Sequence, residues 1–238
     1  MQKPASQIDL SRTWWIFAIF LLVAVAAFWR TNFAPGLGTA SFYIHLHATT
    51  AALWMVLLIS QPLMIRRYWF DWHRRVGQVS YLLVPIVLVS MLLLAHYRIR
   101  TVAEENYQLQ TFVLYLQFSL AALFALAFTL AMFYRRDSEL HARFMVCTGL
   151  TLIDPVFARV FFWTHPLSVE YHQWLTYGLT DALFLILIYL DRRNSRARWV
   201  FPTMLGIFII FQLPALFWWT EWPVWQAFAR WFSSISLT

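Results

Sequence analysis

Four histidines are the residues of this sequence best suited to bind a metal. They are His45, His47, His96 and His172, and each stands near one end of an apolar segment. Imidazole is the commonest metal ligand in proteins and binds zinc, copper and iron, including the iron of haem. The four histidines therefore predict a metal or haem site, and the alternative is that they are polar caps at helix ends.

His47 is a better inward-facing candidate than His45. Each residue of an α-helix turns the chain by about 100°, so these two histidines lie about 200° apart on one helix. Only one of them can face a given partner unless the helix begins between them. The face of the helix that carries His47 also carries Thr50, Trp54, Leu58 and Gln61.

His73 and His141 form a second set, because each stands beside arginines. Arg74 and Arg75 follow His73, and Arg143 comes two residues after His141. These histidines are candidates for binding a cofactor such as a haem, or an anion together with the arginines, since guanidinium suits phosphate and carboxylate. Alternatively, the arginines only orient the chain and contact lipid headgroups.

Asp154, Arg159 and Asp181 are charged residues within apolar segments. An unpaired charge at the centre of a bilayer costs at least about 2.5–3.5 kcal/mol, so such residues face the interior and are functional sites by default. Asp154 and Arg159 lie about 140° apart on an ideal helix. We therefore expect Arg159 to pair with Asp181, and the three residues are candidates for catalysis or proton transfer. A purely structural ion pair is the alternative.

The elements that position these residues are apolar helices. The chain has 238 residues, of which 61% are hydrophobic and only 12% charged, against roughly a quarter charged in soluble domains. A bilayer core needs about 20 apolar residues per helix. The sequence predicts an all-α integral membrane protein, a single domain built as a bundle of seven transmembrane helices. The predicted spans are Trp14–Trp29, Phe42–Ile65, Val76–Tyr97, Gln110–Tyr134, Phe144–Trp163, Trp174–Leu190 and Val200–Trp219, followed by an interfacial tail over 220–238.

The arginines predict the orientation of this bundle. They gather in alternate connections, after the second, fourth and sixth spans, and Lys3 and Arg12 precede the first span. The positive-inside rule then places the N-terminus in the cytoplasm and the C-terminus outside. The net charge of +7 is thus a topology signal, and we expect no nucleic acid partner. The single cysteine, Cys147, excludes a disulfide within the chain.

Several motifs resemble a group of uncharacterised bacterial multi-spanning membrane proteins. They are His45-x-His47, Gln61-Pro62, Arg66-Arg67, His73-Arg74-Arg75-x-Gly77 and His141-x-Arg143-Phe144-Met145 with a downstream Arg159. The chain is also loosely similar to haem-binding cores of the cytochrome b561 kind and to membrane factors for oxidase maturation. The resemblance implies a bacterial inner-membrane location and singles out His47, His73, His141 and Arg159.

Three functions remain open from the sequence. The leading hypothesis is a metal ion or haem b bound by histidines in the external half, for redox chemistry or metallo-enzyme maturation with a partner in the lipid bilayer. The second is a proton-coupled transporter or channel that uses Asp154, Arg159 and Asp181. The third is a zinc-dependent membrane hydrolase with an outer carboxylate as general base.

Overall fold

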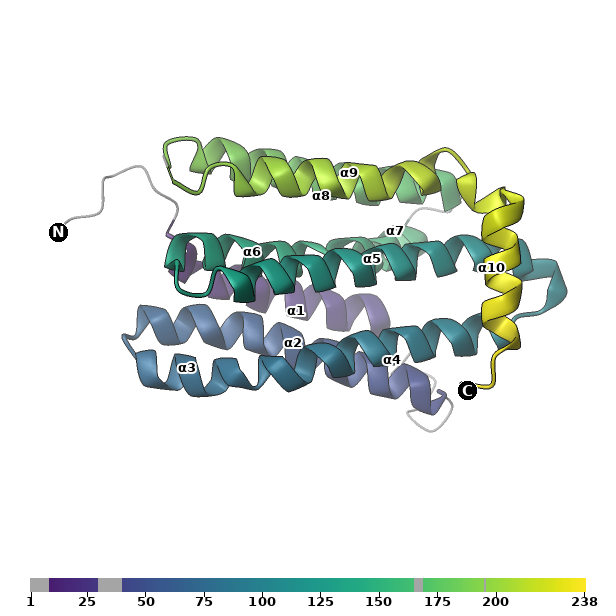
Figure 1. Ribbon diagram of the computed structural model, residues 1–238, viewed down its shortest axis with the longest axis horizontal. Helices are drawn as coiled ribbons and strands as arrows, with labels where there is room; N and C mark the ends of the chain where they lie inside the picture. The colour runs from purple at the N-terminus through teal and green to yellow at the C-terminus, as the bar shows by residue number, and fades with distance from the viewer. Residues whose placement is uncertain (1–8, 30–39, 165–168, 195) are drawn as a thin grey trace.

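The computed structural model shows α-helices that run side by side along one long axis (Figure 1). It describes residues 9–29, 40–164, 169–194 and 196–238, and within these ranges no residue forms a β-strand. The α-helices are α1 (Trp14–Phe28), α2 (Phe42–Arg66), α3 (Phe70–Gln78), α4 (Ser80–Thr101), α5 (Tyr107–Phe133), α6 (Ser138–Leu150), α7 (Ile153–Thr164), α8 (Val169–Asp191), α9 (Val200–Leu216) and α10 (Pro223–Ser234). Short 3₁₀ helices are η1 (Leu10–Arg12), η3 (Glu104–Asn106) and η4 (Trp219–Glu221).

Six helical segments are long and apolar enough to cross a membrane. They are Leu10–Phe28, Phe42–Arg66, Phe70–Thr101, Glu104–Phe133, Ser138–Thr164 and Tyr171–Asp191. The predicted seventh span corresponds to α9, which has 17 residues and is shorter than these six. It ends early because Trp218 adopts a left-handed conformation, with φ of 57°, which an α-helix cannot continue.

Two of the predicted spans are each built from two consecutive helices. The third span divides at Val79, between α3 and α4, whereas Pro85 lies inside α4. The fifth span divides after Thr151, between α6 and α7. Pro155 accounts for this second break, since proline has no N–H to donate to the carbonyl four residues earlier.

The C-terminal segment lies across one end of the bundle (Figure 1). Pro223 starts α10 at a position where its missing N–H costs nothing. The helix packs against α4 and α5, and its buried residues Ala229 and Phe232 share a core with Ala95 and Ile99 of α4. The predicted interfacial tail is therefore an amphipathic helix perpendicular to the bundle axis.

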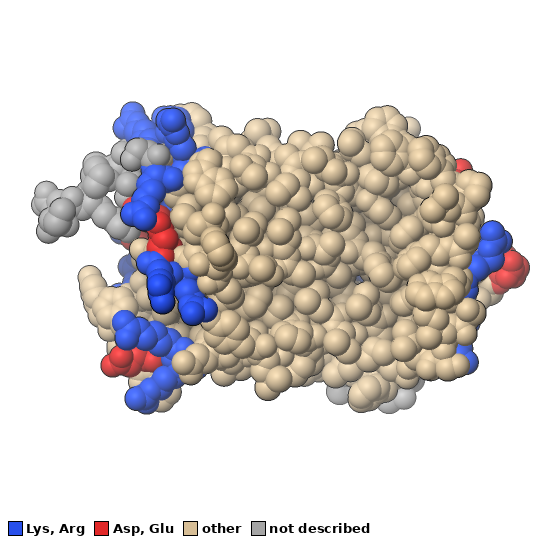
Figure 2. Space-filling model, viewed as in Figure 1, with Lys and Arg blue, Asp and Glu red and all other residues tan. Residues whose placement is uncertain are grey.

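Most of the described cations gather at the other end of the bundle (Figure 2). This arginine-rich end comprises the α2–α3, α5–α6 and α8–α9 connections, and its members are Arg66, Arg67, Arg74, Arg75, Arg135, Arg136, Arg192, Arg193, Arg196 and Arg198. The face in view between the two ends carries an uncharged surface. Large apolar side chains such as Leu22 and Ile210 are 70% and 64% exposed, as in a surface that contacts lipid tails. Lys3 of the predicted charge pattern lies outside the described residues.

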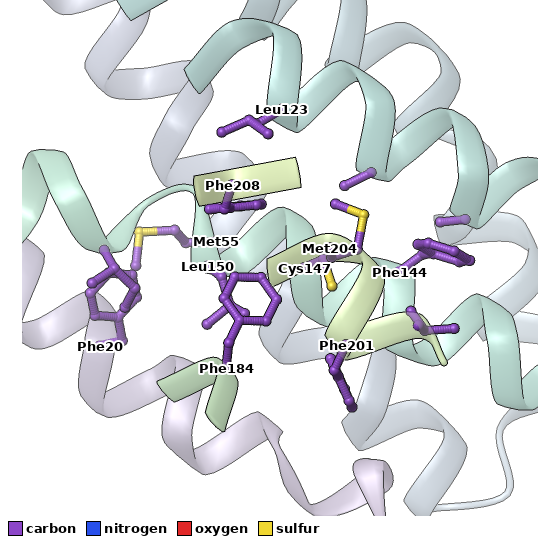
Figure 3. Packing of buried hydrophobic residues seen from close by; sticks show 14 of the residues in the cluster. Phe20, Met55, Leu123, Phe144, Cys147, Leu150, Phe184, Phe201, Met204 and Phe208 are labelled. Atoms are coloured by element: carbon purple, nitrogen blue, oxygen red, sulfur yellow. The ribbon is translucent and has the colours of Figure 1, made fainter. Parts of the chain in front are cut away.

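The main core lies between α1, α2 and α5 to α9 (Figure 3). Phe144, Cys147, Phe184, Phe201 and Met204 are at most 1% exposed in it. A second core surrounds Trp54, which packs edge to face against Phe124 and Phe128 of α5. These two cores fix the relative positions of α2, α5 and α6, which supply part of the wall of a cavity at the arginine-rich end.

Candidate functional site

A cavity of about 880 Å³ opens at the arginine-rich end of the bundle. It lies between η1, α2, α3, α4, the α5–α6 connection and α6. Its described lining residues include no aspartate or glutamate. The charged and polar residues that line it are Ser11, Thr13, Gln61, His73, Arg74, Gln78, Ser80, Tyr81, Arg135, Arg136, Ser138 and His141.

His141 is held in this cavity by the start of α6. Asp137 caps the helix, because its carboxylate accepts from the backbone N–H groups of Glu139 and Leu140 at 3.1 and 3.3 Å. The Nδ1–H of His141 donates to the carbonyl of Ala131 at 2.9 Å. A carbonyl can only accept, so this bond fixes the proton on Nδ1 and leaves Nε2 with its lone pair free. The same arrangement orients histidines that bind metals.

His73 lines the same cavity from α3. The α2–α3 connection is tight, with Tyr68 at φ of 60°, and it folds α3 back against the end of α2. His73 is half-buried, and its Nδ1 is buried without a hydrogen-bond partner among the described residues. The structure thus brings together the two histidines that the sequence predicted for a cofactor.

Gln61 is a buried polar residue of this cavity. Its side chain is 8% exposed, and its Nε2 has no hydrogen-bond partner in the part of the chain that the structure describes. Gly77 permits this placement, since a Cβ there would lie 3.3 Å from Oε1 of Gln61. A buried donor without a partner costs about 1–3 kcal/mol, which a bound ligand with an acceptor could recover.

Only one of the cavity's arginines, Arg74, belongs to the predicted set. Arg74, Arg135 and Arg136 line the cavity, and Nη1 of Arg135 donates to the hydroxyl of Tyr81 at 3.2 Å. Arg143, a predicted partner of His141 in an anion site, instead donates from Nε and Nη2 to Asp191 at 2.6 and 2.5 Å. The positive charge of the cavity therefore comes from α3 and from the α5–α6 connection.

The rest of the cavity wall is apolar. Its apolar members come from five elements and are Leu10, Phe17, Leu57, Leu58, Pro62, Ile65, Met132, Ala142, Met145 and Val146. A volume of about 300–1,000 Å³ with apolar walls and a few polar groups is typical of sites for small molecules and cofactors. The cavity can accommodate an amphipathic ligand whose charged part is anionic.

The four histidines predicted to bind a metal, His45, His47, His96 and His172, do not form a metal site among the described residues. Within these residues there is no group of three or more histidine, cysteine or acidic side chains that could hold a metal ion. His47 Nδ1 lies 3.2 Å from Ser90 Oγ, and His45 is two residues away on the same helix. His172 is 7% exposed and lies beside the ring of Phe162, with centroids 6.1 Å apart.

Both ring nitrogens of His96 contact residues at the C-terminal end of the chain. Its Nε2–H donates to the carbonyl of Ile235 at 2.9 Å, and its Nδ1 lies 2.7 Å from the hydroxyl of Thr238. Arg100 also donates to the Thr238 carbonyl. Both ring nitrogens are therefore engaged in holding the C-terminal segment against α4.

The three intramembrane charges are not brought together as predicted. Asp154 accepts from Gln173 Nε2 at 2.8 Å, and Asp181 accepts from Gln212 Nε2 at 2.9 Å. The guanidinium carbon of Arg159 lies 5.2 Å from the centre of the Phe28 ring. No ion pair among the described residues involves any of the three.

Part of the cavity and the partner of Arg143 were not predicted from the sequence. Arg135 and Arg136 were predicted only to orient the chain in the membrane, and no sequence motif pointed to Tyr81 or Ser138. Asp191 ends the sixth apolar run, 48 residues from Arg143. Its position at the end of a predicted span, beside an arginine cluster, was the one feature of the sequence that could have indicated this pairing.

Comparisons with known proteins add no family assignment. The chain matches no protein-family model, no curated protein sequence and no solved structure.

Proposed function

We propose that the chain is a seven-span protein of a bacterial inner membrane, with its arginine-rich end in the cytoplasm and its C-terminus outside. Six long apolar helices and the shorter α9 support this topology. The gathering of cations at one end of the bundle supports the orientation through the positive-inside rule. On this topology the cavity opens toward the cytoplasm.

We propose that the cavity binds haem b and that the protein transfers electrons. One observation carries this proposal: His73 and His141, from different helices, line one cavity with three arginines and an apolar wall. His141 would offer Nε2 to the iron, because its Nδ1–H is bound to Ala131. His73 would be the second residue to hold the iron. Haem iron with protein ligands is suited to redox chemistry.

The remaining parts of the cavity match the other parts of a haem. Arg74, Arg135 and Arg136 suit its two propionates, since guanidinium forms strong charge-assisted hydrogen bonds with carboxylates. Phe17, Met132 and the neighbouring apolar side chains suit the flat macrocycle. A simple anion would need the arginines but would leave the apolar wall and both histidines without a role.

This proposal moves the predicted haem from the external half of the bundle to the arginine-rich end. An outer metal site has less support, because His96 uses both ring nitrogens in contacts with the C-terminal residues. A redox partner would approach the cavity from its open, positively charged side. Partners with an acidic surface fit this side best.

An absorption spectrum of the purified protein tests the proposal. The protein is produced with added haem precursor, purified in mild detergent, and its haem is extracted and quantified. We expect a Soret band, sharp bands after reduction by dithionite, and stoichiometric haem. Folded protein without a Soret band, which also gains none on titration with haemin, would overturn the haem assignment. Thermal stabilisation of that same protein by an anionic lipid would reassign the cavity to lipid.

A further inference from the structure

Two aspartates of α7 and α8 have amides, and no cation, as their hydrogen-bond partners among the described residues. Asp154, near the start of α7, is 5% exposed, and Gln173 donates to it. Asp181, in the middle of α8, is partly exposed on the surface of the bundle, and Gln212 of α9 donates to it. Among the described residues, neither carboxylate has a cation within 4.0 Å.

A small cavity borders Asp154 and the side chain of Gln212, the residue that donates to Asp181. It has a volume of about 20 Å³ and is lined on its polar side by Ser119, Asp154, Tyr177, Thr180 and Gln212. A cavity of at least about 10–15 Å³ with polar partners has room for one water molecule. Asp154 and the amide that binds Asp181 thus share one polar space, closed off by apolar residues of α5, α6 and α9.

The hydroxyl groups of α8 extend the polar surroundings of Asp154. Thr176 is fully buried, and Gln173 Nε2 donates to its Oγ1 at 3.2 Å. Thr180, 3% exposed, donates to the Thr176 carbonyl at 3.0 Å and lines the small cavity. Gln173, Thr176 and Thr180 therefore form a polar face of α8 beside Asp154, and Asp181 lies about 100° around the helix from Thr180.

The other titratable groups of the surrounding helices supply no neutralising charge. On α5, the hydroxyl of Tyr115 donates to the carbonyl of Phe211 at 2.8 Å. Tyr177 on α8 is 6% exposed, Cys147 on α6 is fully buried, and α1 and α9 carry no titratable side chain. Arg159 is on α7 but lies over Phe28.

We infer that Asp154 and Asp181 form a proton-binding site, in which both carboxyl groups are neutral acids. A carboxylate without a cation inside a bilayer is strongly disfavoured, and protonation removes its charge. Asp181 is the accessible end of the site and Asp154 the enclosed end. The site is separate from the cavity with His73 and His141 and does not depend on the haem proposal.

Labelling with N,N′-dicyclohexylcarbodiimide tests Asp181. This apolar reagent takes the proton of a carboxylic acid onto one nitrogen, and the carboxyl oxygen attacks its central carbon. The adduct rearranges to a stable N-acylurea, so the whole reagent is added and nothing leaves. We expect peptide mass spectrometry of the full-length protein at neutral pH to find the adduct on Asp181. Asp191 is the internal control, because Arg143 donates to both of its carboxylate oxygens and its side chain is only 1% exposed.

Asparagine variants complete the test, because asparagine keeps the size of the side chain and an oxygen that accepts from glutamine. Asp181→Asn should remove the adduct, and Asp154→Asn should leave it in place. Infrared spectra of protein with ¹³C-labelled aspartate should show a protonated carboxyl band that weakens in each variant. Absence of the adduct from Asp181, together with an infrared band of carboxylate that each variant weakens, would overturn the inference.

Discussion

Arg143 of α6 and Asp191 of α8 form an ion pair inside the bundle, and their side chains are only 4% and 1% exposed. Nε and Nη2 donate to the two carboxylate oxygens in a bidentate arrangement. Nη1 of Arg143 also donates to the Glu139 carbonyl at 2.8 Å. The pair ties the start of α6, which carries His141, to the end of α8.

Removal of one partner of this pair should destabilise the protein strongly. Asp191→Leu leaves a buried guanidinium without its counter-charge, and such changes cost about 3–5 kcal/mol. The double variant Arg143→Leu with Asp191→Leu should recover most of that loss. Unfolding of the detergent-solubilised protein measures both. Arg196→Ala is the control, since Arg196 pairs with Asp137 but is 71% exposed, and such pairs contribute at most about 1 kcal/mol. Equal losses for Asp191→Leu and Arg196→Ala would contradict the account.

Gly149 should be intolerant of a side chain. A Cβ at this position would lie 2.5 Å from Cε1 of Phe17, so α1 would have to move away from α6. We expect Gly149→Ala to lower the free energy of unfolding by about 1–3 kcal/mol. Gly206→Ala is the matched control, because a Cβ there meets nothing within 4 Å and alanine favours a helix by up to about 1 kcal/mol. A Gly149→Ala variant as stable as Gly206→Ala would contradict the packing described.

The sequence predicted the inward face of α2 correctly. Thr50, Trp54, Leu58 and Gln61, the residues in phase with His47, are all at most 8% exposed. Helical periodicity was sufficient here, because the positions of side chains around one helix follow from the sequence alone. The same reasoning could not find the cavity, whose two histidines come from α3 and α6. Their proximity depends on how α3 folds back at Tyr68 and where α6 begins.

The break between α3 and α4 had no clear signal in the sequence. Pro85 was the obvious breaker, yet it lies inside α4, and the chain divides at Val79. The sequence also did not indicate that Asp154 and Asp181 would accept hydrogen bonds from glutamines rather than pair with Arg159. Helical phase separates Asp154 from Arg159, but it does not say which side chain of a neighbouring helix will be in reach.

His96 should control the attachment of α10. His96→Ala removes the contacts with Ile235 and Thr238, and Phe232 loses the imidazole ring that it packs against edge to face. We expect faster hydrogen exchange in α10 and earlier proteolysis near the C-terminus, with the exchange of α5 unchanged. Arg230→Ala, an exposed change on the same helix, should leave α10 protected. If α10 exchanges equally in both variants, the histidine does not hold it.

Cysteine labelling should confirm the orientation. The natural Cys147 is fully buried and should not react, so added cysteines report alone. Ser236→Cys should react with a membrane-impermeant maleimide on intact inner-membrane spheroplasts. Arg193→Cys, in the exposed α8–α9 connection, should react only after permeabilisation. The reverse pattern would place the arginine-rich end outside and would contradict the proposed topology.

The most direct test of the central claim is the absorption spectrum of histidine variants reconstituted with haemin. His73→Ala and His141→Ala should each lose the spectrum of iron with two histidine ligands, because each removes one of them. His47→Ala, at the other end of α2, should retain it. If His47→Ala or His172→Ala loses the Soret band while His73→Ala and His141→Ala retain it, the cofactor lies among the outer histidines and the proposed site is wrong.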